Sequence, residues 1–212
     1  MFNWYLLILP ILLIGMIFLV VIKSKIDKKT GRRICRTFVG LFIIAYVMNT
    51  RFLLLNVLSF VLLLLLLVPK NSSFFKKMVE KDEEKSGMLN GLIIYVLMMM
   101  LTILVFPLWI AGCCLINLSF ADGLASFVGE KGKKRLPWNK KKTLEGSLTF
   151  LLVSFVGCFL VMMFLSTLSL DRIFLLTLTT SLIASFVESL SIRMDDNVSV
   201  PLITGIVLYL IS

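Results

Sequence analysis

The sequence predicts an all-α, polytopic integral membrane protein with about eight (seven to eight) transmembrane helices in one bundle. Composition is the first indication. Of the 212 residues, 59% are hydrophobic and 16% are charged, whereas soluble domains are about 45–50% apolar and about 25% charged. The apolar residues also gather in runs of membrane-spanning length, and the basic residues gather between them. These runs use most of the chain, so we expect a single membrane-embedded domain over residues 1–212.

Apolar runs mark the expected helices in chain order. They fall at 2–22, 37–48, 52–68, 88–106, 108 to about 129, 147–170, 173–192 and 198–212. A full crossing takes about 20 residues, so the second and the last of these runs are short. The count is therefore open between seven and eight.

The distribution of Lys and Arg favours eight crossings. The first run has no basic residue before it and a basic cluster after it, which predicts a retained first helix with an outside N-terminus. The segments 23–36, 69–87 and 130–146 then carry seven, five and seven basic residues, and one more follows at 193. All 20 face the cytoplasm in this topology, and only the two arginines at 51 and 172 lie outside. Topology thus explains the net charge of +10 without a nucleic-acid partner.

The counts of histidine and cysteine limit which catalytic and metal-binding groups this protein can use. The chain contains no histidine, which excludes imidazole bases, histidine metal ligands and Ser-His-Asp triads. The four cysteines, at 35, 113, 114 and 158, have no CxxC spacing, and three of them lie in apolar runs. We expect packed thiols rather than disulfides or metal ligands.

The first candidate site residue is an acid inside the run that begins at 108. If that helix continues to about 129, Asp122 lies about 10 Å inside its cytoplasmic end. A carboxylate at this depth is costly and indicates a functional site. Ser126 and Glu130 follow on the same face, and Gly123 leaves room for a ligand to approach the backbone. The alternative is that Asp122 pairs with a neighbouring Lys or Arg and that the small residues only permit close packing.

A basic loop, 131–142, comes next. Its seven cations, the amides of the following helix N-terminus and the hydroxyls of Thr143 and Ser147 are groups that bind a polyphosphate. The alternative is a lysine-rich anchor for anionic lipid headgroups. Glu145 favours the phosphate site, because an acid adds nothing to such an anchor. With Asp122 it would hold Mg²⁺, which takes one or two carboxylates plus substrate phosphates.

A third acidic group brackets the end of the run at 173–192. Glu188 lies about one turn inside that end, where hydrocarbon is expected. Asp195, Asp196 and Asn197 follow, and the alternative for these is a turn and helix N-cap. The predicted topology brings all these acids and two cation-rich loops to one cytoplasmic surface. Acids, cations and hydroxyls without histidine are typical of Mg²⁺-nucleotide phosphoryl transfer.

At these residues the sequence resembles the CTP-dependent lipid kinase family that includes phytol kinase, dolichol kinase and CTP-dependent diacylglycerol kinase. The matching segments are 121–125 with Gly129, then 142–147, then Glu188, and finally 196–197 with Pro201. They keep the family's order and spacing, and the resembling region covers about residues 88–212. Two positions depart from the family pattern. Thr143 replaces the usual serine and retains the hydroxyl, and Arg36 stands where an early histidine is usual.

The resemblance implies transfer of the CTP γ-phosphate to a membrane alcohol, which gives a lipid monophosphate and CDP. It points to Asp122, Lys142, Glu145, Glu188 and Asn197. We assign proton acceptance to Glu188 or Asp122 and phosphate neutralisation to Lys142, and we expect Mg²⁺ at Asp122 and Glu145 with Asp196 as a third candidate. The expected nucleotide-binding residues are Gly123, Ser126, Gly129, Lys131, Lys133, Lys142, Thr143, Gly146, Ser147 and Asn197.

Two other functions stay open. A cytidylyltransferase would make a CDP-lipid from CTP and a lipid phosphate, but its signature includes a His-Gly-Gly segment and this chain has no histidine. A small transporter would carry acids near the bilayer midplane, whereas Asp122 and Glu188 are expected near one face. The acceptor is expected to be an isoprenoid alcohol, such as phytol, geranylgeraniol or a polyprenol, with diacylglycerol as the alternative.

Overall fold

The computed structural model describes residues 61, 76, 90–190 and 196–212, and this part of the chain is helical apart from its connections. The all-α prediction is confirmed for these residues. Apart from residues 61 and 76, the predicted runs and basic segments before residue 88 lie outside the described residues. So do the cysteine at 35, the arginines at 36, 51 and 193, and the acid at 195. The predicted total of about eight spans stays a prediction. The chain divides into two compact units, Met1–Met100 and Leu101–Ser212.

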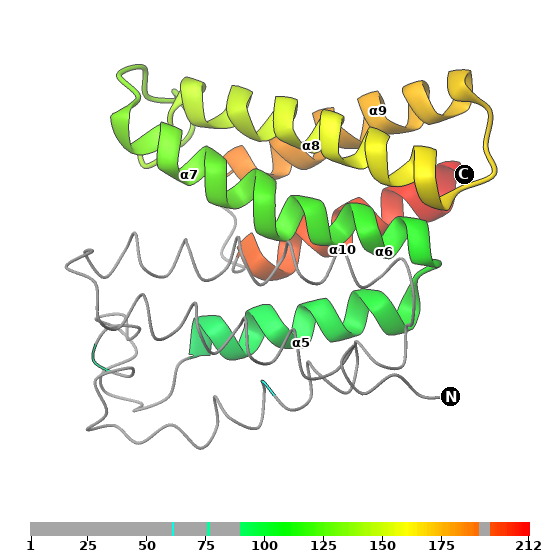
Figure 1. The fold of residues 1–212 in the computed structure, drawn as a ribbon. Coiled ribbons are helices and arrows are strands. Elements are labelled where there is room, and N and C mark those ends of the chain that lie inside the picture. Colours follow the sequence, from blue (N-terminus) through cyan, green and yellow to red (C-terminus); the bar gives the residue numbers. More distant parts are fainter. Residues whose placement is uncertain (1–60, 62–75, 77–89, 191–195) are drawn as a thin grey trace. The chain divides into compact units, whose positions relative to one another are not determined.

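The described helices follow the predicted order. They are α5 (Asn90–Val105), α6 (Leu108–Ile116), the π-helical segment η1 (Asn117–Ala121), α7 (Asp122–Lys131), α8 (Leu144–Leu165), α9 (Leu170–Ser189) and α10 (Asp196–Ile211). Pro107 separates α5 from α6, because proline has no N–H to continue a helix. From Leu108 onward α6, η1 and α7 form one continuous helix (Figure 1).

The helix bounds differ from the apolar runs, at the start of α8 because of a capping side chain. The run expected at 147–170 is the helix α8, which begins earlier, at Leu144, because the Thr143 side chain caps its first turn. That helix ends at Leu165, where Ser166 becomes extended. The helix α10 begins at Asp196, so this acid lies in a first helical turn.

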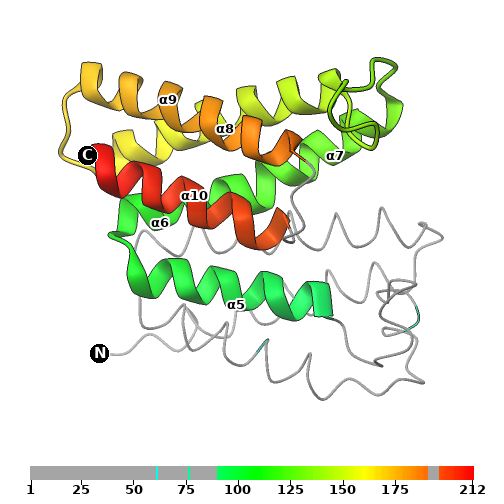
Figure 2. The ribbon, with the colours of Figure 1, turned by 180° about the vertical axis from the view of Figure 1, so that it is seen from behind.

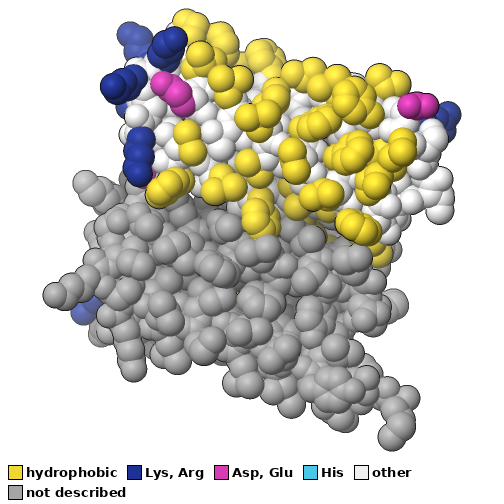
Figure 3. All heavy atoms as spheres, turned by 45° about the horizontal axis from the view of Figure 1, so that its top comes forward, with side chains coloured by type: hydrophobic (Ala, Val, Ile, Leu, Met, Phe, Trp, Pro, Cys, Tyr) yellow, Lys and Arg dark blue, Asp and Glu magenta, His cyan; other side chains and the backbone are white. Residues whose placement is uncertain are grey.

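The second unit exposes apolar side chains over much of its surface, whereas a soluble protein buries most of them. Three helical stretches, Leu108–Lys131, Leu144–Leu165 and Leu170–Ser189, are long and apolar enough to cross a membrane. The helix α8 exposes Leu148, Leu152, Val156 and Leu160, and α9 exposes Leu170, Phe174, Leu178, Leu182 and Phe186. These side chains form a broad apolar face, and most of the basic residues gather at one end of it (Figure 3). Such a face is typical of helices that lie in lipid.

Polar side chains instead lie between the helices. Ser154 on α8 donates a hydrogen bond to Ser181 on α9 at 3.0 Å between hydroxyl oxygens. The amide Nδ2 of Asn117 donates to Thr204 Oγ1 of α10 at 3.0 Å. The three described cysteines, at 113, 114 and 158, are buried free thiols, as predicted. Hydrogen bonds between buried polar side chains therefore add to close packing in holding these helices together, as is usual in a bilayer.

The helices of the second unit alternate in direction. The α7–α8 loop lies at the same end as the last turn of α9 and the first turn of α10 (Figures 1 and 2). The short α8–α9 connection lies at the opposite end. This alternation confirms that the basic loop, Glu188 and Asp196 share one end of the helices, which positions the candidate site.

Candidate functional site

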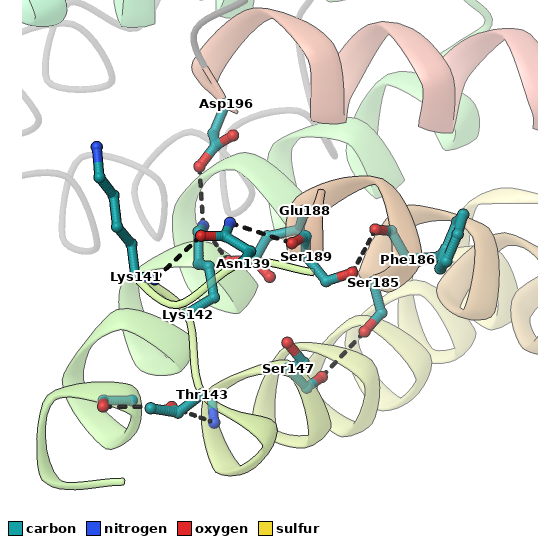
Figure 4. A network of polar contacts seen from close by, with 12 residues as sticks. Asn139, Lys141, Lys142, Thr143, Ser147, Ser185, Phe186, Glu188, Ser189 and Asp196 are labelled. Carbon is teal, nitrogen blue, oxygen red and sulfur yellow. Dashed lines mark hydrogen bonds and ion pairs between the residues drawn. The ribbon is translucent and has the colours of Figure 1, made fainter. Parts of the chain in front are cut away.

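A lysine between two carboxylates forms the centre of the candidate site. The ammonium of Lys142 makes ion pairs with Glu188 Oε1 and with Asp196 Oδ2, the latter at 2.8 Å (Figure 4). We call Lys142, Glu188 and Asp196 the lysine–carboxylate cluster. Its members come from the loop before α8, the last turn of α9 and the first turn of α10. Three segments that are distant in sequence thus meet at one end of the helices.

Glu188 is the most buried member of the cluster. The residue is 3% exposed, whereas the side chains of Lys142 and Asp196 are 26% and 36% exposed. Its second oxygen, Oε2, is buried and has no hydrogen-bond partner among the described residues. Because a buried carboxylate oxygen without a partner is costly, this atom is suited to accept a proton or to contact a ligand.

Lys142 carries a permanent positive charge. Burial of the ammonium lowers its pKa, but the attraction of Glu188 and Asp196 outweighs burial and raises the pKa of Lys142 well above its ordinary value. The group is therefore charged throughout the neutral range. It is suited to neutralise an anionic ligand and unsuited to exchange protons during a reaction.

Asp122 lies beside the cluster. Its carboxylate is close enough to Glu188 for the two negative charges to repel each other. It is the first residue of α7 and directly follows the π-helical segment η1, a kind of distortion that is frequent at functional sites. Among the described residues no three acidic or cysteine side chains are grouped closely enough to hold a metal ion. A magnesium ion at Asp122 would thus need substrate phosphates as further ligands, which is its usual preference.

Glu145 is engaged in the loop rather than in the cluster. Its Oε1 accepts hydrogen bonds from the backbone N–H groups of Lys133 and Lys134 at 3.0 and 3.2 Å. Its Oε2 accepts a second, longer bond from the Lys134 N–H at 3.3 Å. The carboxylate therefore holds the start of the basic loop against α8. The magnesium role predicted for Glu145 stays a prediction.

Thr143 and two glycines hold α7 and α8 together at the site. The Thr143 hydroxyl donates to the Gly129 carbonyl and accepts from the Gly146 N–H, both at 3.2 Å. A Cβ added to Gly146 would lie 3.0 Å from the Ala125 carbonyl oxygen, and one added to Gly129 would lie 3.0 Å from Thr143 Oγ1. Close packing thus accounts for these glycines. The predicted nucleotide contacts of Thr143 and both glycines stay predictions.

The other predicted nucleotide-binding residues divide into two groups. Ser147 and Asn197 lie near the cluster: Ser147 accepts a hydrogen bond from Ser185 through its carbonyl at 3.0 Å, and Asn197 is buried beside Asp196. Gly123 is buried and Ser126 half-buried in α7. The side chains of Lys131 and Lys133 are exposed, and the Lys131 ammonium lies 4.8 Å from the centre of the Phe127 ring. These two lysines are not brought into the cluster.

Sequence reasoning missed two residues that join the basic loop to α9. The Trp138 Nε1–H donates to the Ser189 hydroxyl at 3.1 Å, and Asn139 Nδ2 donates to the Ser189 carbonyl at 3.2 Å. In a lysine-rich loop an asparagine is expected to be a turn residue, so the loop's composition indicates a role only for its lysines. The tryptophan next to that asparagine was the available signal, because the N–H of a tryptophan often finds a hydrogen-bond partner where its ring is part-buried.

The cap at Thr143 leads to a first testable expectation. Replacing Thr143 with Ser keeps the capping oxygen and is expected to leave thermal stability nearly unchanged. Replacing it with Val removes the oxygen but keeps the branched shape, and is expected to cost about 1 kcal/mol. Thermal unfolding of the two variants in the same detergent measures the difference. Equal midpoints for Thr143→Ser and Thr143→Val would contradict the cap.

The geometry therefore defines a class of protein: a lipid-facing helical unit with a charged lysine–carboxylate cluster at one end. Comparison with known proteins shows that the sequence of this chain is similar to those of proteins named phytol kinase. The chain is 35% identical over 103 residues to a probable chloroplastic phytol kinase 3 of Glycine max, which covers 45% of this chain and 32% of that protein. It is 33% identical over 101 residues to the chloroplastic phytol kinase 1 of Arabidopsis thaliana, covering 42% of this chain and 32% of that protein.

A third relative gives a longer match. The chain is 33% identical over 123 residues to a probable chloroplastic phytol kinase of Triticum aestivum, covering 52% of this chain and 41% of that protein. The matches thus span about a third to two fifths of the length of these relatives. No family model matches the chain. No solved structure matches it either.

Proposed function

We propose that this chain is a CTP-dependent lipid kinase that transfers the γ-phosphate of CTP to a membrane alcohol. The acceptor is an isoprenoid alcohol such as phytol, geranylgeraniol or a polyprenol, with diacylglycerol as the alternative. The products are a lipid monophosphate and CDP. The observation that carries the proposal is the charged Lys142, held between Glu188 and Asp196 at one end of lipid-facing helices. The similarity to proteins named phytol kinase supports the same reading.

The cluster contains a group for each partner of a phosphoryl transfer, an acceptor for the alcohol proton and a positive charge for the phosphates. In the proposed reaction the alcohol oxygen bonds to the γ-phosphorus, the bond between that phosphorus and the β-phosphate oxygen breaks, and CDP leaves with the electron pair. Glu188 Oε2 accepts the alcohol proton, since that oxygen has no other partner among the described residues. Lys142 neutralises charge on the phosphates, which is the main catalytic requirement of this chemistry.

Magnesium is the proposed cofactor, and the carboxylates present fit it. Asp122 adds negative charge near Glu188, beside the larger attraction of Lys142, and a divalent cation would balance that added charge. We place the ion at Asp122 and Asp196, with Glu145 as the less favoured ligand because both its oxygens already accept hydrogen bonds. When bound, the ion would neutralise charge that develops on the phosphates.

The proposed position of the site follows from where its two substrates are found. The acceptor alcohol is apolar and stays in lipid, whereas the nucleotide is soluble. A kinase for such a pair needs its charged groups where the helices leave the bilayer. The position of the cluster, at one end of helices long and apolar enough to cross a membrane, supports that arrangement. We propose that this end faces the cytoplasm, because the basic residues of the sequence collect on that side.

Product analysis tests the proposal directly. The purified protein in lipid vesicles is given Mg²⁺, a mixture of isoprenoid alcohols and diacylglycerol, and CTP or ATP labelled in the γ-phosphate. We expect label in a lipid monophosphate, with CTP preferred over ATP. Asp122→Asn, which has the same shape but no charge, is expected to reduce the transfer by at least about a hundredfold. Normal turnover in Asp122→Asn would refute the metal role of Asp122.

The same experiment identifies the competing reaction. When a lipid phosphate replaces the alcohol, a cytidylyltransferase would release the label as pyrophosphate and form a CDP-lipid. That result, without label in any lipid monophosphate, would refute the kinase.

A further inference from the structure

Asn139 is buried in the middle of an exposed loop. The residue is 6% exposed, although its neighbour Trp138 is 53% exposed and Lys140 is also exposed. Burying an amide side chain is unfavourable unless its donors and acceptors are paired. The position of Asn139 is therefore set by its hydrogen bonds, and these bonds lead to the cluster.

The bonds of Asn139 connect the lysine loop to the end of α9. Its Nδ2 donates to the carbonyl of Ser189 at 3.2 Å, and its Oδ1 accepts from the Lys141 N–H at 3.1 Å (Figure 4). Its backbone carbonyl accepts from the Lys142 N–H at 3.0 Å. Ser189 directly follows Glu188, so one side chain joins the backbone that carries the cluster's lysine to the backbone that carries its buried acid.

We propose that Asn139 is a positioning residue that places the Lys142 ammonium beside Glu188 and Asp196. This inference rests on the proposed function, because positioning matters only if Lys142 contacts the reacting phosphates. Lysine has a flexible four-carbon stem, so a fixed backbone at residue 142 restricts where the charge can go. A displacement of about 1 Å at a reacting centre is able to cost about a hundredfold in rate.

The test compares Asn139→Asp with Ser189→Ala. Asn139→Asp keeps the shape and the acceptor for Lys141, but it places a carboxylate oxygen against the Ser189 carbonyl. It is expected to lower kcat/KM for the nucleotide by about tenfold. Ser189→Ala removes the hydroxyl that pairs with Trp138 and leaves the Asn139 bond to the backbone carbonyl. Its kcat/KM is expected to stay within about threefold of the original.

A double-mutant cycle separates positioning from a general effect on folding. If Asn139 acts through Lys142, Asn139→Asp has less than about a twofold further effect when Lys142 is already Met. A full further tenfold loss in that background would overturn the proposal, as would unchanged kcat/KM in Asn139→Asp alone.

Hydrogen exchange of the loop amides gives a readout that needs no turnover. Asn139→Asp keeps the acceptors of the Lys141 and Lys142 N–H groups but loses the bond to Ser189 that holds the loop against α9. Exchange at both amides is expected to accelerate, because a loop released from α9 opens more often. Unchanged exchange at both amides would refute the anchoring role of Asn139. Absence of phosphate transfer by the original protein would instead refute the proposed function, so the two failures are distinguishable.

Discussion

Replacing Lys142 with Met is expected to reduce phosphate transfer by about a thousandfold. The substitution keeps most of the apolar stem but removes the charge that we assign to phosphate neutralisation, and the loss of one such preorganised charge costs about 10²–10³ in rate. It also leaves Glu188 buried without the cation that pairs with it. We expect the free energy of unfolding to fall by up to about 3 kcal/mol at neutral pH.

The matched control is Lys141→Met. Lys141 precedes Lys142 in the same loop, but its side chain is exposed and extends away from the cluster (Figure 4). The two variants have the same net charge, so a difference between them reports position rather than overall charge. Lys141→Met is expected to lose no more than about threefold in rate and to unfold at the original temperature. Equal losses in both variants would refute a specific role for Lys142.

Replacing Glu188 with Gln is expected to reduce transfer by about 10²–10⁴, the usual contribution of a general base. The side chain keeps its shape, and Lys142 keeps its ion pair with Asp196 at 2.8 Å. Stability should therefore change much less than in Lys142→Met. The pH profile identifies the role: protonation of Glu188 should slow the original protein at low pH, and Glu188→Gln should lose that acidic limb.

Two further variants make the Glu188 result decisive. Asp171→Asn removes an exposed acid at the opposite end of the same helix and is expected to leave transfer and stability unchanged. Combining Glu188→Gln with Lys142→Met removes both charges of the buried pair. This combination should recover stability relative to Lys142→Met alone but no activity. An acidic limb that persists in Glu188→Gln would assign the proton to another group.

The order of the helices in the second unit could be predicted from the sequence. Long apolar runs indicate helices wherever lipid surrounds the chain, because only a helix satisfies its own backbone hydrogen bonds there. Alternation of those runs then places the basic loop, Glu188 and Asp196 at one end. The bounds were less accurate. The start of α8 at Leu144 is determined by the cap at Thr143 and not by hydrophobicity.

The partners within the site could not be predicted. Lys142 pairs with acids that are 46 and 54 residues away in sequence, and six other cations in the loop were equally available from composition. Lys142 differs from those six cations through the positioning proposed for Asn139. The side chain and the backbone carbonyl of Asn139 accept hydrogen bonds from the Lys141 and Lys142 N–H groups. Glu145, which resembles a metal ligand in sequence, instead binds two backbone amides of the loop.

For the part of the chain that the structure describes, the sequence by itself determined that the fold is helical with an apolar outer face and that the basic loop, Glu188 and Asp196 lie at one end. These are local properties, because the hydrophobicity and charge of each segment express them without any partner. Only the tertiary structure decided that Lys142 rather than Lys131 or Lys133 meets Glu188, and that Gly129 and Gly146 bring α7 against α8. Such pairings depend on where helices cross and how the loop docks, and close packing sets both.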